Sequence, residues 1–278
     1  MSSRAVDRWD SAEAAEQWRQ GAARRAQVLG AATERMLEAA ALGPGMDVLD
    51  LAAGSGETSV LAARRVGPTG SVLAIDISAP MLALASEAAR AAGLDNVRTL
   101  VGDIGRIQLD PERFDAAISR MGLMFLDDFA AGVRRVVRSL RPGARLAAIV
   151  WGSASRNPFM GLPIEVVTEL GHPPTAEMTI MRAFSVSEPA RLARRLEEGG
   201  LRDVSVDAVP TRREFASLDE ALDLLGTLSG AVEELTADMG AATREAFWRE
   251  MRRRVADYTL ADGSVVMTGE VLLARGLR

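Results

Sequence analysis

The sequence predicts an α/β fold in which helices cover both faces of a mainly parallel sheet. Three observations support this prediction. Short apolar runs alternate with helical segments between residues 46 and 151, the run at 46–51 leads into a glycine-rich turn, and the run at 71–75 ends in Asp76. Alternation at this spacing is typical of parallel strands, because parallel neighbours need a crossover connection that is usually a helix.

The first half of the chain contains the clearest predicted elements. Apolar residues at helical spacing predict a helical region over 11–41, which Ser11 can cap. Ser78 can cap a later helix that has Pro80 in its first turn. Turn residues then bound the remaining elements. The sequence predicts strands at 46–51, 71–75, 97–101, 114–119 and 145–151, and helices at 56–66, 78–92 and 129–140.

The second half is less regular. Residues 153–184 contain four prolines, so we expect a connection with at most short helices there. A helix over 187–199, with Ser187 as its cap, precedes a strand over 201–211. A long helical stretch over 218–258 is expected to break near three glycines, and the last strand covers 264–274. The predicted parts are N-terminal helices (1–42), a core (43–152), a lid insertion (153–186) and a C-terminal part of the core (187–278) with a helical insertion at about 215–258.

Composition excludes several classes of function. The 278 residues suit one large domain or one domain with a sizeable insertion. A formal charge of −5 with scattered basic residues argues against a nucleic-acid partner. The chain has no cysteine and one histidine, so we expect no metal site. We find neither a signal peptide nor an apolar run of membrane-spanning length, and we therefore expect a cytoplasmic protein without a membrane span.

The turn after the first strand departs from the dinucleotide-binding pattern. Its alternate positions hold Asp50, Ala52, Gly54 and Gly56, followed by Glu57. The third glycine of G-x-G-x-x-G is absent. A carboxylate at the start of a helix also repels a pyrophosphate, whereas it suits a ligand with an ammonium group. We expect Ala52 to keep a negative φ. A glycine-rich turn that binds no ligand is the alternative interpretation.

Asp76, at the end of the second strand, completes the pattern of a nucleoside site. Its carboxylate can accept hydrogen bonds from both ribose hydroxyls, while the glycines let the backbone approach the ligand. The alternative is that Asp76 caps the following helix, although Ser78 is already placed to do so.

Later motifs follow in a fixed order: Gly102-Asp103-Ile104 after the third strand, residues 114–120 in the fourth, and residues 139–143 before the fifth. In order and spacing, these motifs and the glycine turn resemble the class I S-adenosylmethionine (SAM)-dependent methyltransferases. The likeness is strongest to the small-molecule branch, with its ubiquinone and menaquinone biosynthesis enzymes and natural-product methyltransferases. It covers about residues 48–151, and more weakly the rest of the chain.

The resemblance implies a Rossmann-like sheet of seven strands, with the last strand antiparallel and inserted beside the others. It implies SAM as the cofactor and an acceptor for the adenine amino group at Asp103. The cofactor-binding residues that it implies are Asp50, Ala52, Gly54, Gly56, Asp76, Ile77, Met81, Gly102, Asp103, Ile104, Ser119 and Arg120. In this family the N-terminal helices fold over the cofactor, which would use Trp9 and Trp18; packing of the helix is the alternative.

The acceptor is expected near Ser119, Arg120, Met121 and Phe125, since ligands bind beyond the carboxyl ends of the strands. Met and Leu residues in the predicted lid favour an apolar acceptor, and the lid is also a candidate dimer surface. His172, in a proline-rich loop, is the candidate general base, and Arg120 is a second candidate catalytic residue that would pair with an acidic or carbonyl group of the acceptor.

The sequence therefore predicts a SAM-dependent methyltransferase that methylates an O or C atom of a small apolar acceptor such as a polyketide or quinone. A methyltransferase that acts on tRNA or protein is disfavoured by the acidic balance of charge and the lack of a basic patch. Two further alternatives remain open. One is a SAM-binding member of the fold that is not catalytic or is regulatory. The other is a nicotinamide-dependent oxidoreductase, which the missing glycine disfavours.

Overall fold

The computed structural model describes residues 10–227 and 230–278 of the chain, and these divide into two compact units. The first unit comprises the residues up to 150 together with 188–209 and 272–278. The second comprises 151–187 and 210–271. No helix in the described part of the chain is both long and apolar enough to cross a membrane.

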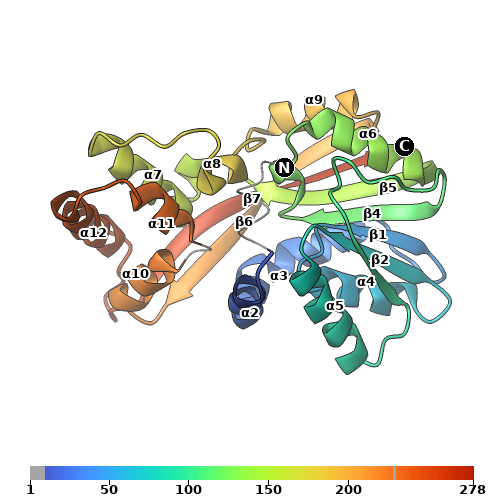
Figure 1. Ribbon diagram of the computed structural model, residues 1–278, viewed down its shortest axis with the longest axis horizontal. Helices are drawn as coiled ribbons and strands as arrows, with labels where there is room; N and C mark the ends of the chain where they lie inside the picture. The colour runs from blue at the N-terminus through green and yellow to red at the C-terminus, as the bar shows by residue number, and fades with distance from the viewer. Residues whose placement is uncertain (1–9, 228–229) are drawn as a thin grey trace. The chain divides into compact units, whose positions relative to one another are not determined.

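The described strands form a seven-stranded sheet with the order β3-β2-β1-β4-β5-β7-β6, which confirms the predicted fold class (Figure 1). The strands are β1 (Asp47–Leu51), β2 (Ser71–Asp76), β3 (Val97–Val101), β4 (Phe114–Arg120), β5 (Leu140–Trp151), β6 (Arg202–Phe215) and β7 (Val265–Leu277). The first five pair in parallel. β7 lies between β5 and β6, as the resemblance implied.

The direction of β7 is given by its hydrogen bonds to the β5 side. The Arg278 N–H donates to the carbonyl of Ala144, whereas the Gly152 N–H donates to the carbonyl of Glu270. The two strands therefore run in opposite directions, and β7 is antiparallel to β5.

The central strand β1 sets the edge at which a ligand would bind. Its residues from Val48 onward are fully buried, as expected for a parallel strand covered on both faces. Asp50 lies opposite Ala74 of β2 and Ile118 of β4. The carboxyl ends of three neighbouring strands therefore meet at one edge of the sheet, where the turns carry the predicted motifs.

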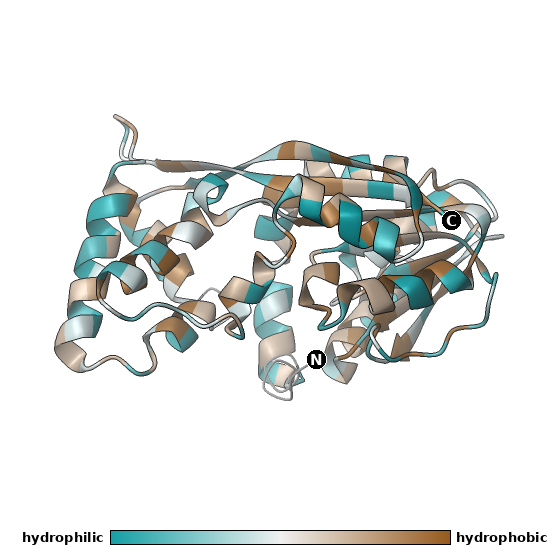
Figure 2. Cartoon of the chain, turned by 90° about the horizontal axis from the view of Figure 1, so that it is seen from above, coloured by the Kyte–Doolittle hydropathy of each residue, from teal (hydrophilic) through white to brown (hydrophobic). Residues whose placement is uncertain are grey.

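Helices cover the two faces of this sheet in the first unit (Figure 1). They are α2 (Ala12–Gln20), α3 (Ala22–Ala39), α4 (Glu57–Val66), α5 (Ala79–Ala91), α6 (Phe129–Ser139) and α9 (Pro189–Glu198). The hydroxyls of Ser11 and Ser78 cap α2 and α5 as predicted. Ser187 does not cap α9, because the capping position belongs to Glu188. Hydrophilic and hydrophobic residues alternate along the helices, as in amphipathic segments (Figure 2).

The second unit contains α7 (Pro158–Glu169), α8 (Thr179–Ala183), α10 (Leu218–Gly226), α11 (Ala231–Thr236) and α12 (Ala241–Ala256). The predicted breaks near Gly226, Gly230 and Gly240 are confirmed. The prediction of at most short helices in 153–184 is wrong, because α7 has 12 residues.

The proline content of α7 is misleading for a physical reason. Pro158 occupies the first turn, where no helical hydrogen bond is lost, and Pro163 lies only five residues further on. Phe159, Val166 and Val167 are buried, and this apolar burial outweighs the single bond that Pro163 removes.

Candidate functional site

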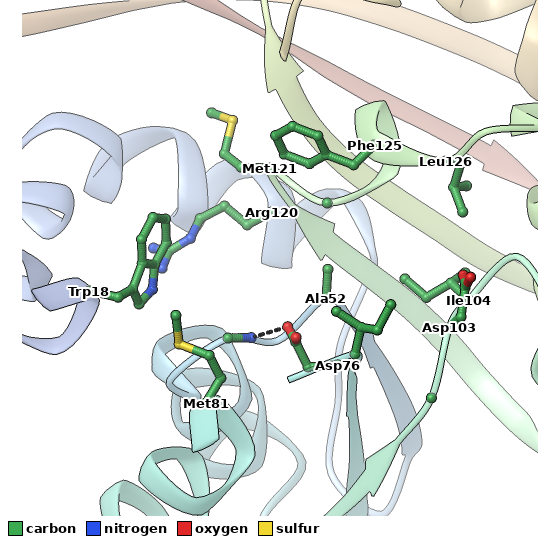
Figure 3. A pocket seen from close by; sticks show the side chains of 14 residues that line it. Trp18, Ala52, Asp76, Met81, Asp103, Ile104, Arg120, Met121, Phe125 and Leu126 are labelled. Atoms are coloured by element: carbon green, nitrogen blue, oxygen red, sulfur yellow. Dashed lines mark hydrogen bonds between the residues drawn. The ribbon is translucent and has the colours of Figure 1, made fainter. Parts of the chain in front are cut away.

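A pocket opens in the first unit beyond the carboxyl ends of β1, β2, β3 and β4 (Figure 3). It encloses about 790 Å³ of empty space, including the part open to solvent. Its lining is mainly apolar and comes from α2, α5, the last residues of β2 and β4, and the segments that follow the four strands. The lining residues are Trp18, Ala52, Gly54, Asp76, Ile77, Met81, Gly102, Asp103, Ile104, Arg120, Met121, Gly122, Phe125 and Leu126.

Nine of the twelve residues predicted to bind the cofactor line this pocket. The other three, Asp50, Gly56 and Ser119, lie outside its lining. Ser119 is buried, and its hydroxyl donates to the carbonyl of Leu51 at 3.0 Å. Most of the motif residues therefore line a pocket at the strand ends, while these three lie in the packing around it. Their roles in cofactor binding stay predictions.

In the glycine turn, every second residue from position 52 to position 56 has a positive φ. These are Ala52 at +55°, Gly54 at +55° and Gly56 at +83°. The expectation of a negative φ at Ala52 is wrong. The turn needs a left-handed backbone at this position, which costs an alanine about 1–2 kcal/mol.

Close approaches explain why the turn tolerates only small residues. A Cβ on Gly56 would lie 2.7 Å from the Cα of Ala85 in α5. Across the pocket floor, a Cβ on Gly122 would lie 2.3 Å from the Cβ of Ala52. Gly122 therefore leaves room for the methyl group of Ala52, and neither position has space for a larger residue.

Asp76 stands at the centre of the pocket wall. One carboxylate oxygen accepts from the Gly54 N–H at 2.8 Å, and the other accepts from the Ser78 N–H at 3.0 Å. Burial raises the pKa of Asp76, and these two backbone hydrogen bonds oppose the rise. The bonds fix the orientation of the carboxylate while it remains part of the pocket lining (Figure 3).

Asp50 lies beneath the turn and is fully buried. One of its oxygens accepts from the hydroxyls of Thr58 at 2.7 Å and Ser59 at 2.6 Å, both in α4. The other oxygen has no hydrogen-bond partner among the described residues. Burial raises the pKa of Asp50 to about 6 despite the two hydroxyl donors. Asp50 thus ties the end of β1 to the first turns of α4.

The loop after β3 forms the opposite wall. Gly102, Asp103 and Ile104 all line the pocket there. One oxygen of Asp103 accepts from the Gly105 N–H at 2.8 Å, which holds the loop in a tight turn.

Arg120, at the end of β4, extends toward Trp18 (Figure 3). Its guanidinium group pairs with one oxygen of Glu57, and Arg25 pairs with the other. Arg120 also donates to the Thr33 hydroxyl at 3.3 Å. Burial favours a higher pKa for Glu57, but the hydrogen bond from Arg25 and the charge of Arg120 bring the pKa below its ordinary value.

This pairing removes one argument drawn from the sequence. Glu57 does not face a ligand as a free carboxylate, since two guanidinium groups occupy its two oxygens. Its charge therefore offers no reason to exclude a pyrophosphate or to favour an ammonium group. The glycine spacing is the argument that remains against a dinucleotide.

The side of the pocket formed by the segment after β4 is apolar. Met121 and Phe125 line it as predicted, and Gly122 and Leu126 lie in the same stretch, which includes the short helix η1 (Leu123–Phe125). We did not predict these last two, because no motif marks them in the sequence.

The remaining candidates lie elsewhere in the chain. Trp18 lines the pocket, with the guanidinium of Arg25 4.0 Å from its ring centre, whereas Trp9 lies outside the described residues. His172 is exposed in the loop after α7, in the second unit. Its role as a base stays a prediction.

Comparison with known proteins shows similarity to methyltransferases over part of the chain. The family model described as a methyltransferase domain matches residues 48–143. Nocamycin O-methyltransferase of Saccharothrix syringae is 35% identical over 112 residues, which are 40% of this chain and 40% of that protein. Demethylmenaquinone methyltransferase of Listeria welshimeri serovar 6b is 32% identical over 105 residues, or 38% of this chain and 44% of that protein. The matches thus span less than half the length of these curated relatives.

Solved structures extend the likeness in fold. A SAM-dependent methyltransferase from Aquifex aeolicus has a TM-score of 0.54 at 22% identity, over 70% of this chain and 91% of that one. Geranyl diphosphate C-methyltransferase from Streptomyces coelicolor A3(2) has a TM-score of 0.52 at 19% identity, over 89% and 78%. The [4+2]-cyclase SpnF is also similar, with a TM-score of 0.51 at 19% identity, over 88% and 78%. The fold alone therefore does not decide the reaction.

The segment matched by the family model contains the glycine turn, Asp76, the loop after β3 and Arg120, which together build most of the pocket. Residues 48–143 are therefore a methyltransferase domain, in a chain that has the fold of the class I SAM-dependent methyltransferases.

Proposed function

We propose that the protein is a SAM-dependent methyltransferase that methylates an O or C atom of a small apolar acceptor. One observation carries this proposal. The segment that matches the methyltransferase-domain family also forms a pocket in which the Asp76 carboxylate and a glycine turn adjoin apolar walls.

The chemistry of the lining fits an adenosyl ligand. The Asp76 carboxylate would accept from the ribose hydroxyls, as oriented acids do in nucleoside sites. Ile77 and Ile104 supply apolar surface for the adenine, and Asp103 lies beside Ile104 to receive its amino group (Figure 3). Gly54 allows close approach of the backbone, because it has no side chain.

SAM supplies an activated methyl group, which an acceptor O or C atom attacks as the carbon–sulfur bond breaks and S-adenosylhomocysteine leaves. The protein contributes by positioning the acceptor in line with this bond and by excluding water. Met121, Phe125 and Leu126 provide an apolar wall for an acceptor without charged groups. A polyketide or a quinone has this character.

Proton removal from the acceptor needs a base or an acceptor that is already ionised. Arg120 does not serve as the base, since a guanidinium keeps its proton at ordinary pH and this one is paired with Glu57. His172 stays our candidate base. His172→Ala with unchanged turnover would dismiss this assignment.

A [4+2]-cyclase has a similar fold, so the fold by itself does not require methyl transfer. The second candidate is therefore a protein that binds SAM without transferring its methyl group. Calorimetric titration with SAM, S-adenosylhomocysteine and NAD(P)H tests the donor site. Micromolar binding of both adenosyl ligands, and not of the nicotinamides, supports the proposal. Binding of nicotinamides alone refutes it. Incubation with SAM bearing a labelled methyl group and a panel of phenolic and quinol acceptors then separates transfer from mere binding.

A further inference from the structure

A smaller pocket opens in the second unit, where α7 begins beside the paired strands β6 and β7; we call it the α7 pocket. Residues 157–160 line it from the start of α7, Thr211 and Arg213 from β6, and residues 267–269 from β7. It encloses about 220 Å³ of empty space, including the part open to solvent. Pockets that bind whole small molecules measure roughly 300–1,000 Å³. The α7 pocket therefore suits a small ion or a single chemical group.

Thr211 is a buried residue whose hydroxyl is not used by the protein. It shares a face of β6 with Val209 and Phe215, since side chains alternate along a strand, and it is only 7% exposed. Its hydroxyl makes no hydrogen bond within the described part of the chain. The side-chain atoms of the described residues that are both enclosed and unbonded are Arg25 Nε and Asp50 Oδ1. The Thr211 hydroxyl is therefore not enclosed, and it is open to the pocket that it lines.

The start of α7 supplies a backbone donor. This helix has 12 residues, and the first of them, Pro158, has no N–H. The N–H groups of Met160 and Gly161 donate to the carbonyl of Asn157, whereas the Phe159 N–H has no acceptor within the described part of the chain. The N-terminus of a helix also carries a partial positive charge. A free N–H and this partial charge together favour an anion.

Arg213 adds a full positive charge to the lining. The central carbon of its guanidinium group lies 4.9 Å from the ring centre of Phe159 and 5.4 Å from that of Trp151, and both contacts are attractive. Phe159 is in turn stacked on Phe215, with 5.4 Å between the ring centres. Among the described residues that line the pocket, none is acidic. The lining thus offers donors and positive charge, without a carboxylate that would repel an anion.

The carboxamide of Asn157 holds two walls of the pocket together. Its Nδ2 donates to the carbonyls of Ser153 at 3.1 Å and Glu270 at 3.0 Å, and its Oδ1 accepts from the Glu270 N–H at 3.1 Å. A Cβ on Gly269 would lie 2.5 Å from this Oδ1 and 3.0 Å from the hydroxyl oxygen of Thr211, so glycine leaves room for both groups. Asn157 uses both of its N–H donors on the backbone and is a positioning residue, whereas the Thr211 hydroxyl remains available.

We propose that the α7 pocket binds a tetrahedral oxyanion, either free phosphate or the phosphate group of a small molecule. The Thr211 hydroxyl, the Phe159 N–H and the Arg213 guanidinium group donate to its oxygens. Backbone N–H groups at a helix start and guanidinium groups are donors that phosphates commonly bind. Every residue of this site belongs to the second unit, so phosphate binding here is independent of the SAM site proposed in the first unit.

Thermal unfolding with added phosphate tests the site, because a ligand that binds only the folded protein raises the melting temperature as its concentration increases. Sodium phosphate should raise the melting temperature of the wild-type protein more than sodium chloride of equal ionic strength does. Thr211→Val keeps nearly the same shape without the hydroxyl, and it should lose most of this difference. Calorimetry should show that the variant binds inorganic phosphate about ten- to a hundredfold more weakly.

The same variant distinguishes a hydroxyl that binds a ligand from one that stabilises the fold. Without phosphate, Thr211→Val should be at least as stable as the wild-type protein, since it removes an unpaired hydroxyl. Thr236 in α11 is the matched control, because it is 6% exposed and its hydroxyl already donates to the carbonyl of Val232 at 3.0 Å. Thr236→Val should keep the full effect of phosphate. Arg213→Lys should keep part of the affinity, because it retains the charge without the fork.

Phenyl phosphate and phenol separate the two sources of the anion. Tighter binding of phenyl phosphate than of inorganic phosphate, without binding of phenol, identifies the phosphate group of a small molecule. Equal or weaker binding of phenyl phosphate identifies the free ion. Phosphate binding at this site is wrong if phosphate stabilises the wild-type protein no more than chloride does, or if Thr211→Val responds to phosphate as the wild-type protein does. A loss of stability in Thr211→Val without phosphate would instead make its hydroxyl a structural group.

Discussion

β1 and β2 each carry an aspartate near the same edge of the sheet. The two carboxylates differ in their hydrogen-bond donors and in their access to the pocket. Asp50 is fully buried and accepts from side-chain hydroxyls of the next helix. Asp76 lines the pocket and accepts from backbone N–H groups. The residue type alone therefore does not assign a role.

The difference arises from the helix that succeeds each aspartate in the chain. Thr58 and Ser59 lie in the first turn of α4, and both of their hydroxyls donate to the same carboxylate oxygen of Asp50. After Asp76, the hydroxyl of Ser78 is turned to the N-terminus of α5 and caps it. Hydroxyl donors of α4 tie Asp50 into the packing, whereas backbone donors orient Asp76, the carboxylate that we propose to hold the ribose.

The largest expected effect concerns the packing of the turn after β1 against α5. Gly56→Ala places a Cβ 2.7 Å from the backbone of α5 at a φ of +83°, so the loss of unfolding free energy should be about 2–5 kcal/mol. Urea unfolding measures it. Gly93→Ala is the matched control, because Gly93 also has a positive φ, +70°, but no atom lies within 4 Å of its added Cβ. That variant should lose only about 1–2 kcal/mol. Equal losses would show that crowding against α5 is unimportant.

The next effect concerns pH and Asp50. The pKa of Asp50 rises from 3.8 to about 6 on folding, so the folded protein binds this proton more tightly than the unfolded chain. Stability from this group is present below pH 4 and is lost as pH rises toward about 6. A pKa shift of about two units corresponds to at most about 3 kcal/mol of unfolding free energy.

Asp50→Asn cannot titrate at this position and serves as the reference. The stability of the wild-type protein relative to Asp50→Asn should fall between pH 4 and pH 7. Chemical unfolding over this pH range measures the difference. A constant or rising difference would contradict the buried, raised-pKa carboxylate.

Asp76 tests the other side of the comparison. Asp76→Ala removes the carboxylate proposed to hold the ribose, and a buried charge-assisted hydrogen bond is worth about 1.5–3 kcal/mol. Calorimetry should show S-adenosylhomocysteine binding about ten- to a hundredfold more weakly. Asp50→Asn should bind it as the wild-type protein does. An unchanged dissociation constant in Asp76→Ala would remove Asp76 from the site.

The smallest effect concerns strain in the turn after β1. Ala52→Gly relieves a non-glycine residue at a φ of +55° and should add about 0.5–1 kcal/mol to the stability. Differential scanning calorimetry measures the shift. A lower melting temperature would mean that the methyl group of Ala52 packs better than its backbone strain costs.

Much of the fold was predictable, because the elements of the core depend on local signals. Apolar runs bounded by glycine and proline set β1 to β5, and Ser11 and Ser78 mark helix starts that the structure confirms. The helix α7 was missed because the tertiary burial of Phe159 and its neighbours outweighs Pro163, which local signals cannot show.

In the pocket, too, the features that follow from local motifs were predictable, and those that depend on distant residues were not. Asp76 and Gly54 were predictable from motif spacing. The pairing of Glu57 with two arginines was not, because Arg25 and Arg120 are 32 and 63 residues away in the sequence. The positive φ at Ala52 was also missed, since its cause is the backbone path of the turn rather than the residue itself.

The contact between Ala52 and Gly122 links two distant positions of the sequence. A side chain at position 122 would collide with the methyl group of Ala52. Substitution of Gly122 should therefore destabilise the turn while position 52 is alanine. A Cβ at position 122 would also lie 3.0 Å from Ser119 Oγ, so a glycine at position 52 would relieve only the closest of these contacts. The effect of a substitution at position 122 therefore depends on which residue stands at position 52.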